Sequence, residues 1–335
     1  MLESLKYKYT KRYLIRRMLN AFLVFFIVLL LDFLIPRLMP GNFAMIYYAS
    51  LLQDTTGSGV NATAVFYQIE KQFGLNQPIY AQFYVYLHQV FSLPPNFGPS
   101  FEYFPYPAWS VVMGALKWTL LLLGTSQAIS WTLGVGMGVL LAVNKGRILD
   151  KVVEPLLLFI LSIPPFWFGL VLILVFAIEL RLLPPVGAYS LHPTLGSILT
   201  HMILPMVTII VATLPSHAIV IRNSALEVLS SDFALAMRAQ GLRRTTFLIK
   251  VVKNSILPSL TQLFLSLGYL FGGIYVVEYT FSYPGVGTVI ASAIFSRDYP
   301  VLEAGLFITT LAIIAFNIAA DLLYPLLDPR ISYVD

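Results

Sequence analysis

Thr119–Val143 reads TLLLLGTSQAISWTLGVGMGVLLAV, a run of apolar and small polar residues that contains no charged side chain. An α-helix needs about 20 apolar residues to cross the hydrocarbon core of a bilayer, and this run is long enough. Five further stretches of similar character lie along the chain, so the sequence predicts six membrane spans. These spans cover Leu19–Leu38, Thr119–Val143, Val152–Ile178, Ile203–Ile221, Pro258–Tyr279 and Ala304–Leu326.

The composition of the whole chain supports the same fold class. Of its 335 residues, 58% are hydrophobic and 11% are charged, against roughly 45–50% and about 25% in soluble domains. This excludes an ordinary soluble enzyme, a disordered protein and a nucleic-acid binder of the usual kind. The chain has no cysteine, which excludes a disulfide framework, a thiolate metal site and a cysteine nucleophile. We therefore predict an all-α, polytopic membrane protein.

The distribution of basic residues predicts the orientation of the spans. Sixteen of the 21 Lys and Arg residues lie in the amino-terminal tail, in the loop after the second span, in the region after the fourth span and at the carboxyl terminus. Cytoplasmic loops carry such an excess of Lys and Arg. Both termini are therefore expected in the cytoplasm, which requires an even number of spans. The five basic residues on the opposite side are Arg37, Lys71, Lys117, Arg181 and Arg297.

The spans and the segments between them suggest four parts. We expect a basic cytoplasmic tail at 1–18, a first transmembrane helix at 19–39, an extracytoplasmic loop or cap at 40–116, and a five-helix core at 117–330 that contains a polar inner loop at 223–254.

The outer segment is too long for a simple turn. Apolar residues at helical spacing predict one amphipathic helix around residues 66–74 and a second around residues 80–87. Five prolines make residues 93–107 irregular. An amphipathic cap packed against the spans is the expected arrangement.

The inner loop has the pattern of two helices joined at a glycine. Ser231 or Asp232 can cap the first helix, and Gly241 allows the chain to reverse with a positive φ. Arg243 and Arg244 then begin a second helical stretch. Such an elbow with a small-residue surface suits docking against another protein, while a solvated loop whose basic residues set the orientation is the alternative. The small residues of the first helix are Ala234, Ala236 and Ala239.

This loop resembles a known family. Asp232–Gly241 (DFALAMRAQG), followed by Ile256-Leu-Pro258, is similar to the cytoplasmic signature loop of ATP-binding-cassette (ABC) importer permeases. Further stretches, in order along nearly the whole chain, resemble the B-type permease of dipeptide and oligopeptide importers. They are Tyr13–Arg17, Pro40–Gly41, Phe73–Pro78, Ser162–Trp167, Leu182–Gly187, Val277–Phe281, Tyr283–Gly287, Arg297–Pro300, Asp321–Tyr324 and Leu327–Arg330.

The resemblance implies a type I importer fold with six transmembrane helices and several partners. These would be a homologous second permease subunit, two ATPase subunits that bind ATP and Mg, an extracytoplasmic substrate-binding protein and the membrane lipid, but no nucleic acid. This chain would itself bind no cofactor or metal and catalyse no reaction. Its cargo would be di- or oligopeptides, with oligosaccharides and then nickel as alternatives within the family.

The resemblance also assigns roles within the inner loop. Asp232 would be the helix cap, Gly241 the elbow, and Arg238 a polar contact to the ATPase. The sequence departs from the family pattern, since Phe233-Ala-Leu stands where Tyr-Val-Arg is usual and Gln240 where Lys is common. The other residues assigned to the ATPase-coupling loop are Phe233, Ala236, Ala239 and Leu242.

The sequence contains little that indicates nucleotide binding or catalysis by this chain. No Gly-x-x-x-x-Gly-Lys-[Ser/Thr] phosphate loop and no nucleophile–base pair is present. Gly134-Val-Gly-Met-Gly138 is more typical of close helix packing than of a dinucleotide loop. We expect His217 to pack as a hydrogen-bonded residue and Pro164-Pro165 to break or kink the third span. An ion-coupled secondary transporter remains the rival from another class, but it would need ion-binding acids at midspan.

Overall fold

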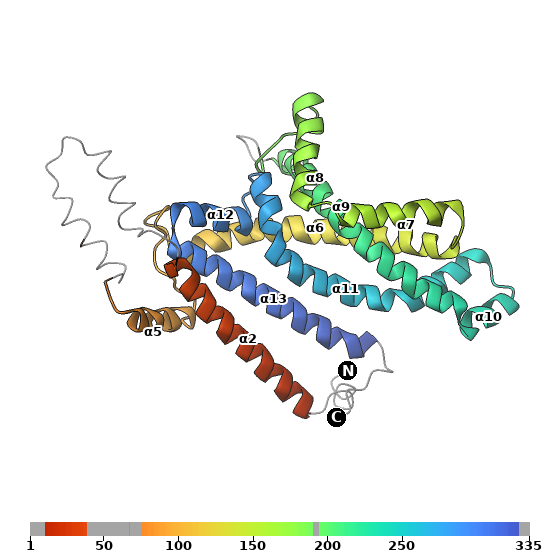
Figure 1. The fold of residues 1–335 in the computed structure, drawn as a ribbon, viewed down its shortest axis with the longest axis horizontal. Coiled ribbons are helices and arrows are strands. Elements are labelled where there is room, and N and C mark those ends of the chain that lie inside the picture. Colours follow the sequence, from red (N-terminus) through yellow and green to blue (C-terminus); the bar gives the residue numbers. More distant parts are fainter. Residues whose placement is uncertain (1–10, 39–66, 68–75, 190–193, 328–335) are drawn as a thin grey trace. The chain divides into compact units, whose positions relative to one another are not determined.

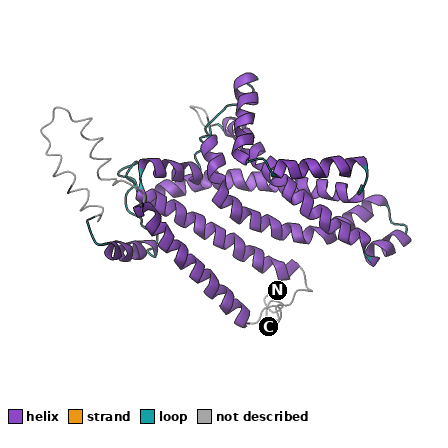
Figure 2. Cartoon of the chain, in the orientation of Figure 1, coloured by secondary structure: helices purple, strands orange, loops and turns teal. Residues whose placement is uncertain are grey.

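The computed structural model describes residues 11–38, 67, 76–189 and 194–327 of the chain, and this part is helical with no β-strand (Figures 1 and 2). The elements in order are α2 (Lys11–Leu38), α5 (Ile79–Val90), α6 (Ala108–Val143), α7 (Ile148–Leu161), α8 (Pro165–Leu172), the π-helix η1 (Ile173–Glu179), α9 (Leu195–Ser230), α10 (Asp232–Ala239), α11 (Arg244–Thr280), α12 (Val286–Ser296) and α13 (Tyr299–Leu327).

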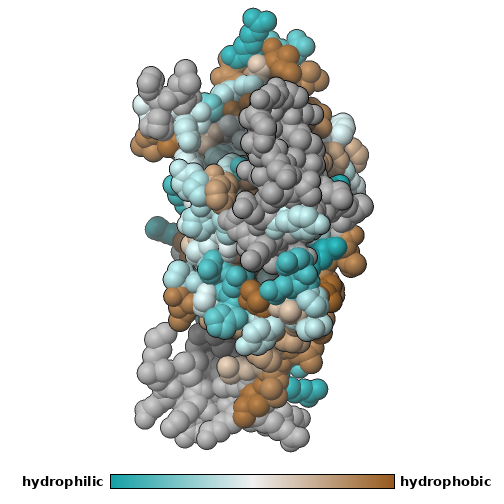
Figure 3. Space-filling view, turned by 90° about the vertical axis from the view of Figure 1, so that its left-hand side faces the viewer, coloured by the Kyte–Doolittle hydropathy of each residue, from teal (hydrophilic) through white to brown (hydrophobic). Residues whose placement is uncertain are grey.

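The six predicted spans correspond to four single helices and two bent pairs of helices. Within the described residues, four helices are long and apolar enough to cross a bilayer, and two bent pairs pass the same test. Many large hydrophobic side chains of these helices are exposed, and Figure 3 shows such residues, in brown, at the surface between hydrophilic ones. Exposed apolar surface of this kind fits contact with lipid. The four long spans are Met18–Leu38, Ala108–Val143, Leu195–Ser230 and Tyr299–Asp321.

The third span is broken where the two prolines lie. Ile148–Leu161 and Pro165–Glu179 meet at 100°, and α8 stands almost perpendicular to α7 in Figure 1. Pro164 is the N-cap of α8, and Pro165 begins that helix, where its missing N–H leaves no intrahelical bond unmade. The prediction of a break at this point is confirmed. The fifth span bends by 60° between Gly268 and Phe271.

The chain divides into two compact units, which we describe separately. The first contains Met1–Ala21, Trp118–Pro284 and Ala312–Asp335, and the second contains Phe22–Lys117 and Gly285–Leu311. In the second unit, α5 confirms the helix predicted around residues 80–87, and the helix predicted around residues 66–74 falls mostly outside the described residues. The ring of Phe33 lies 5.0 Å from that of Phe83, which gives α5 an aromatic contact with α2.

A buried carboxylate holds the proline-rich segment of the second unit in place. Asp298 is fully buried and accepts hydrogen bonds from the backbone N–H groups of Phe101 (2.9 Å) and Glu102 (3.0 Å). It also accepts from the Ser100 hydroxyl. These donated hydrogen bonds compensate the carboxylate for the water contacts that it loses on burial. As predicted, residues 93–107 contain no helix or strand.

In the first unit, glycines bring α6 close to α9. A Cβ at Gly134 would lie 2.7 Å from the Cβ of His217, and one at Gly138 would lie 2.5 Å from the carbonyl oxygen of Ala218. Gly136, between them, has nothing within 4 Å of such a Cβ. Two of the three glycines are therefore packing contacts, which confirms the prediction of close helix packing.

Polar side chains of α6 form hydrogen bonds with α9 and α11 at successive positions along the helix. Thr119 donates to Glu278 (2.7 Å), His217 hydrogen-bonds to Gln127 (3.0 Å), and Trp131 donates to Ser259 (2.8 Å). Each of these bonds connects α6 with α9 or α11. The prediction that His217 packs as a hydrogen-bonded residue is confirmed.

The glycine contact gives a prediction with a matched control. Gly138→Ala should lower the thermal unfolding temperature of the purified protein, because the new methyl group meets a backbone oxygen and overpacking costs about 1–3 kcal/mol. Gly136→Ala should leave that temperature unchanged or slightly raised, since alanine favours the helix and meets no atom. Equal melting temperatures for the two variants would contradict the close contact.

Candidate functional site

The most distinctive site of the first unit is the sharp connection between α9 and α11, which we call the elbow (residues 231–247). Helix α9 ends at Ser230, the short helix α10 follows from Asp232 to Ala239, and α11 begins at Arg244. In Figure 1, α10 lies at the end of the first unit where α9 and α11 meet.

The start of α10 differs by one residue from the expectation. Ser231 occupies the N-cap position with extended backbone angles (φ −81°, ψ 158°), and Asp232 is the first helical residue. The Ser231 hydroxyl donates to the carbonyl of Val228 at 2.7 Å, so it binds the preceding helix and does not cap α10. The prediction that Asp232 is the cap is therefore wrong. Its carboxylate still lies in the first turn, where the helix dipole favours a negative charge.

The end of α10 depends on Gly241. Its φ is +64°, a left-handed conformation that strains residues with a Cβ. The N–H of Gly241 donates to the carbonyl of Arg238 at 3.0 Å, and that of Gln240 donates to Ala236 at 3.1 Å. These bonds close the helix with a glycine just past its end, a common helix terminus. The predicted reversal at Gly241 is confirmed.

The two faces of α10 have different surroundings. Ala234 and Met237 are almost completely buried, and their spacing of three residues places them on the inner face. Phe233 and Leu235 are 44% and 67% exposed. Being two positions apart, Phe233 and Leu235 lie on different sides of α10, flanking the buried face, and each exposes a large apolar group that is suited to contact with a protein. Of the residues predicted for this site, Leu242 is half-buried, and those that are exposed are Asp232, Phe233, Ala236, Arg238, Ala239 and Gly241.

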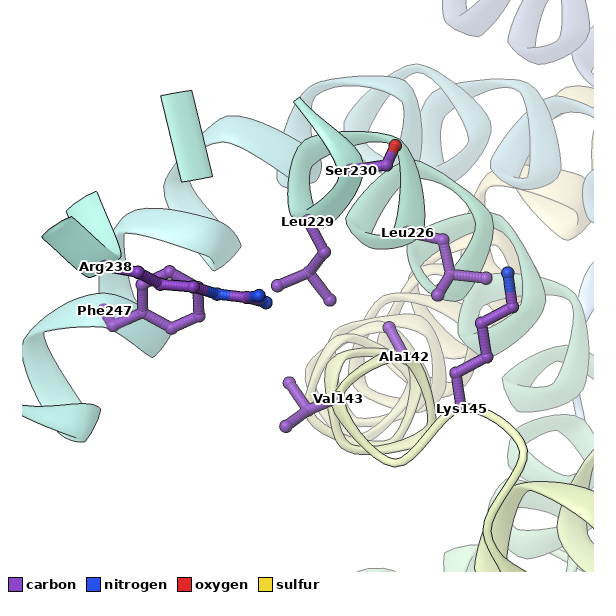
Figure 4. A pocket seen from close by; sticks show the side chains of 8 residues that line it. All are labelled: Ala142, Val143, Lys145, Leu226, Leu229, Ser230, Arg238 and Phe247. Atoms are coloured by element: carbon purple, nitrogen blue, oxygen red, sulfur yellow. The ribbon is translucent and has the colours of Figure 1, made fainter. Parts of the chain in front are cut away.

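A hollow of about 270 Å³ lies beside the elbow (Figure 4). Arg238 points into it from α10, with its guanidinium carbon 5.5 Å from the ring centre of Phe247. Lys145, just past the end of α6, lies on the other side. The hollow thus has basic groups on two sides and mostly apolar walls. Its lining residues are Ala142, Val143, Lys145, Leu226, Leu229, Ser230, Arg238 and Phe247.

A buried apolar cluster supports the elbow from within. It joins the ends of α6, α9 and α11, and the half-buried Phe247 packs against it. The position of the elbow therefore follows from the packing of these three helices. Its buried members are Val139, Ala142, Ile221, Ala225 and Val251.

Sequence reasoning did not identify several residues of this site. Lys145 lies more than 80 positions before the elbow, and no local pattern connects the two. Met237 could have been recognised from its helical spacing to Ala234. In the part of the chain that the structure describes, no group of three or more His, Cys, Asp or Glu side chains is arranged to hold a metal ion.

The conformation of Gly241 can be tested directly. Gly241→Pro should open the elbow, because proline fixes φ near −65° and removes the N–H that bonds to Arg238. Gly241→Asn should preserve it at a cost of about 1–2 kcal/mol, since asparagine visits the left-handed region more readily than other residues. Limited proteolysis of membranes should show faster cleavage within residues 231–247 for the proline variant alone. Identical cleavage rates for both variants and the wild type would exclude this role.

Comparison with known proteins places this geometry in a family context. Residues 134–333, which include the elbow, match the family described as binding-protein-dependent transport system inner membrane component. Residues 10–102 match the N-terminal family of such membrane components.

Individual relatives cover almost the whole chain. The probable peptide ABC transporter permease protein y4tP of Sinorhizobium fredii is 33% identical over 323 residues, which are 96% of this chain and 99% of the relative. The glutathione transport system permease protein GsiC of Escherichia coli (strain K12) is 32% identical with the same coverage of both chains. The GsiC protein of Salmonella choleraesuis is equally similar.

Proposed function

The chain belongs to the family of binding-protein-dependent transport system inner membrane components, and we propose that it is the permease subunit of an ATP-driven ABC importer for peptides. The relatives are permease proteins of ABC transporters. As a permease subunit, the chain is not itself the ATPase, because ATP is hydrolysed by separate subunits.

The observation that carries this proposal is the elbow. Helix α10 is short, exposes Phe233 and Leu235, and is held by a glycine turn at the junction of two long helices. A protruding helix on a rigid base is suited to docking in a cleft of a partner. In the proposed complex the ATPase subunit supplies that cleft, Phe233, Ala236 and Ala239 form the contact surface, and Arg238 makes a polar contact.

ATP hydrolysis is then coupled to transport through the helices that the elbow connects. When the ATPase subunits close on ATP, they move α10. Because α10 is joined at both ends to long helices, its displacement passes directly into α9 and α11. We propose that this motion switches the pathway between inward-facing and outward-facing states.

The proposed assembly contains more chains than this one. A homologous second permease completes the pathway, two ATPase subunits bind ATP and Mg, and an extracytoplasmic binding protein delivers the cargo. The family description, which names binding-protein-dependent transport, supports the last of these partners.

The proposed topology places both termini in the cytoplasm. The excess of Lys and Arg in the inner segments supports it, and the elbow then faces the ATPase subunits. Residues 1–18 form the cytoplasmic tail, residues 40–116 the outer cap, and residues 117–330 the permease core.

Peptides are the proposed cargo. One relative carries the name of a peptide transporter and two carry that of a glutathione transporter, and glutathione is itself a tripeptide. No described feature of the chain favours oligosaccharides, nickel or an ion-coupled mechanism over peptides.

The docking role predicts an effect of charge on the contact surface. Ala236→Arg should reduce the amount of ATPase subunit that co-purifies with the permease by at least tenfold, because a long cation replaces a small exposed side chain in the proposed contact. Ile148→Arg, at an exposed position of α7, should leave co-purification unchanged. Unchanged co-purification with Ala236→Arg would place the contact elsewhere.

The cargo is tested with the assembled transporter in lipid vesicles. ATP hydrolysis should rise several-fold when the cognate binding protein is added with short peptides, and it should not rise with oligosaccharides. Stimulation by sugars alone would support the importer proposal but would show that the cargo is an oligosaccharide and not a peptide. If no ATPase subunit accompanied the wild-type permease, the importer proposal itself would fail.

A further inference from the structure

A buried arginine connects α9 with α7 near the elbow. The Nε of Arg222 donates to Oδ1 of Asp150 at 2.8 Å, and its terminal nitrogen donates to Oδ2 of the same residue at 3.1 Å. The same terminal nitrogen lies 2.9 Å from the Glu154 carboxylate. The side chains of Arg222 and Asp150 are only 10% and 6% exposed. Arg222 and Asp150 therefore form a bidentate ion pair that is largely shielded from solvent, and Glu154 is a second carboxylate partner of Arg222.

The ion pair extends into the loop after α6. Oδ2 of Asp150 also accepts a hydrogen bond from the N–H of Gly146 at 2.9 Å, and Gly146 has a positive φ of +76°. The next residue back is Lys145, which lines the hollow beside the elbow. A continuous set of bonds therefore runs from α9 through Asp150 to the loop that faces Arg238.

The position of Arg222 in α9 connects this set of bonds to the elbow. Eight residues of uninterrupted helix, about 12 Å, separate Arg222 from Ser230 at the end of α9. On the other side, α7 leads to the 100° break at Pro164-Pro165 and then to α8. A second contact between α7 and α9 lies further along, where Leu157 and Ala218 share a buried apolar cluster.

We propose that Arg222 is a positioning residue for coupling, which fixes α7 and the loop between α6 and α7 to α9, the helix that leads into the elbow. This inference rests on the proposed function. When the ATPase subunits displace α10, the pair makes the base of α7 move together with α9. The broken third span then follows the elbow, although α7 and α10 are not consecutive helices in the chain.

The chemistry of arginine suits this role better than that of lysine. A planar guanidinium bonds to both oxygens of one carboxylate and still reaches a second acid, and so fixes distance and orientation together. A lysine ammonium keeps the charge but not the paired geometry. Arg222→Lys should therefore hold α7 near α9 while loosening their relative orientation.

The test uses the complete transporter in lipid vesicles with its binding protein and peptide, and it measures transport per ATP hydrolysed. Arg222→Lys and Asp150→Asn should each lower this ratio at least fivefold, while co-purification of the ATPase subunits and basal ATP hydrolysis stay within about twofold of wild type. Arg147→Lys, an exposed residue of the same loop, is the control and should keep the wild-type ratio. An unchanged ratio in the Arg222 and Asp150 variants overturns the proposal.

A second measurement covers variants that fail to assemble. The chain has no native cysteine, so Leu157→Cys with Ala218→Cys places the only two thiols of this chain on α7 and α9 while the ion pair is kept. If the two helices move as one body, oxidative cross-linking should leave transport per ATP at the level of the uncross-linked protein. Loss of transport on cross-linking would mean that α7 and α9 must separate, which overturns the proposal. Failure of the wild type to retain ATPase subunits would instead count against the importer function.

Discussion

The close packing of α6 against α9 is the contact on which the first unit depends. In a bilayer, helices gain no hydrophobic energy from leaving lipid, so association relies on close approach and on interhelical hydrogen bonds. Gly134 and Gly138 permit that approach, because any larger side chain would meet His217 or the backbone of α9. The Gln127–His217 bond uses the same short separation. Packing and polar bonding thus reinforce one another along α6.

The position of the elbow depends on this packing. The cluster that contains Val139 and Ile221 lies at the ends of α6 and α9, and it extends to Val251 of α11. Helix α10 adds only Ala234 and Met237 to the buried interior. Such a helix has few contacts to hold it by itself, so its base must be rigid if it is to transmit motion. The small inner face and the glycine turn suit a helix that is positioned by its neighbours.

Local patterns in the sequence predicted much of the fold and of the elbow. Apolar runs of about twenty residues indicate spans whatever their partners are, and Pro164-Pro165 breaks a helix for reasons within the backbone. Gly241 likewise marks a turn by its own conformational freedom. The residues left Ser231 and Asp232 both open as the N-cap, because both types favour that position; Ser231 takes it, while its hydroxyl bonds to the carbonyl of Val228 in the preceding helix. Lys145 and the Arg222–Asp150 pair could not be predicted, since each joins segments more than 70 residues apart.

The departures of the elbow from the family pattern that its sequence resembles fall on both faces of α10. Leu235 stands at the position of the arginine in the resembled pattern, and it is 67% exposed, so a cation at this position is not needed to support the buried side of α10. Phe233 stands at the position of the pattern's tyrosine and exposes its ring, so it offers a similar shape to the proposed contact without a hydroxyl. Ala234, at the position of the pattern's valine, is buried, so this departure is a smaller side chain that keeps the inner face apolar. The inner face of α10 is therefore constrained by packing, and in the proposed coupling the displacement is carried by the shape of α10 and by its attachment to long helices at both ends.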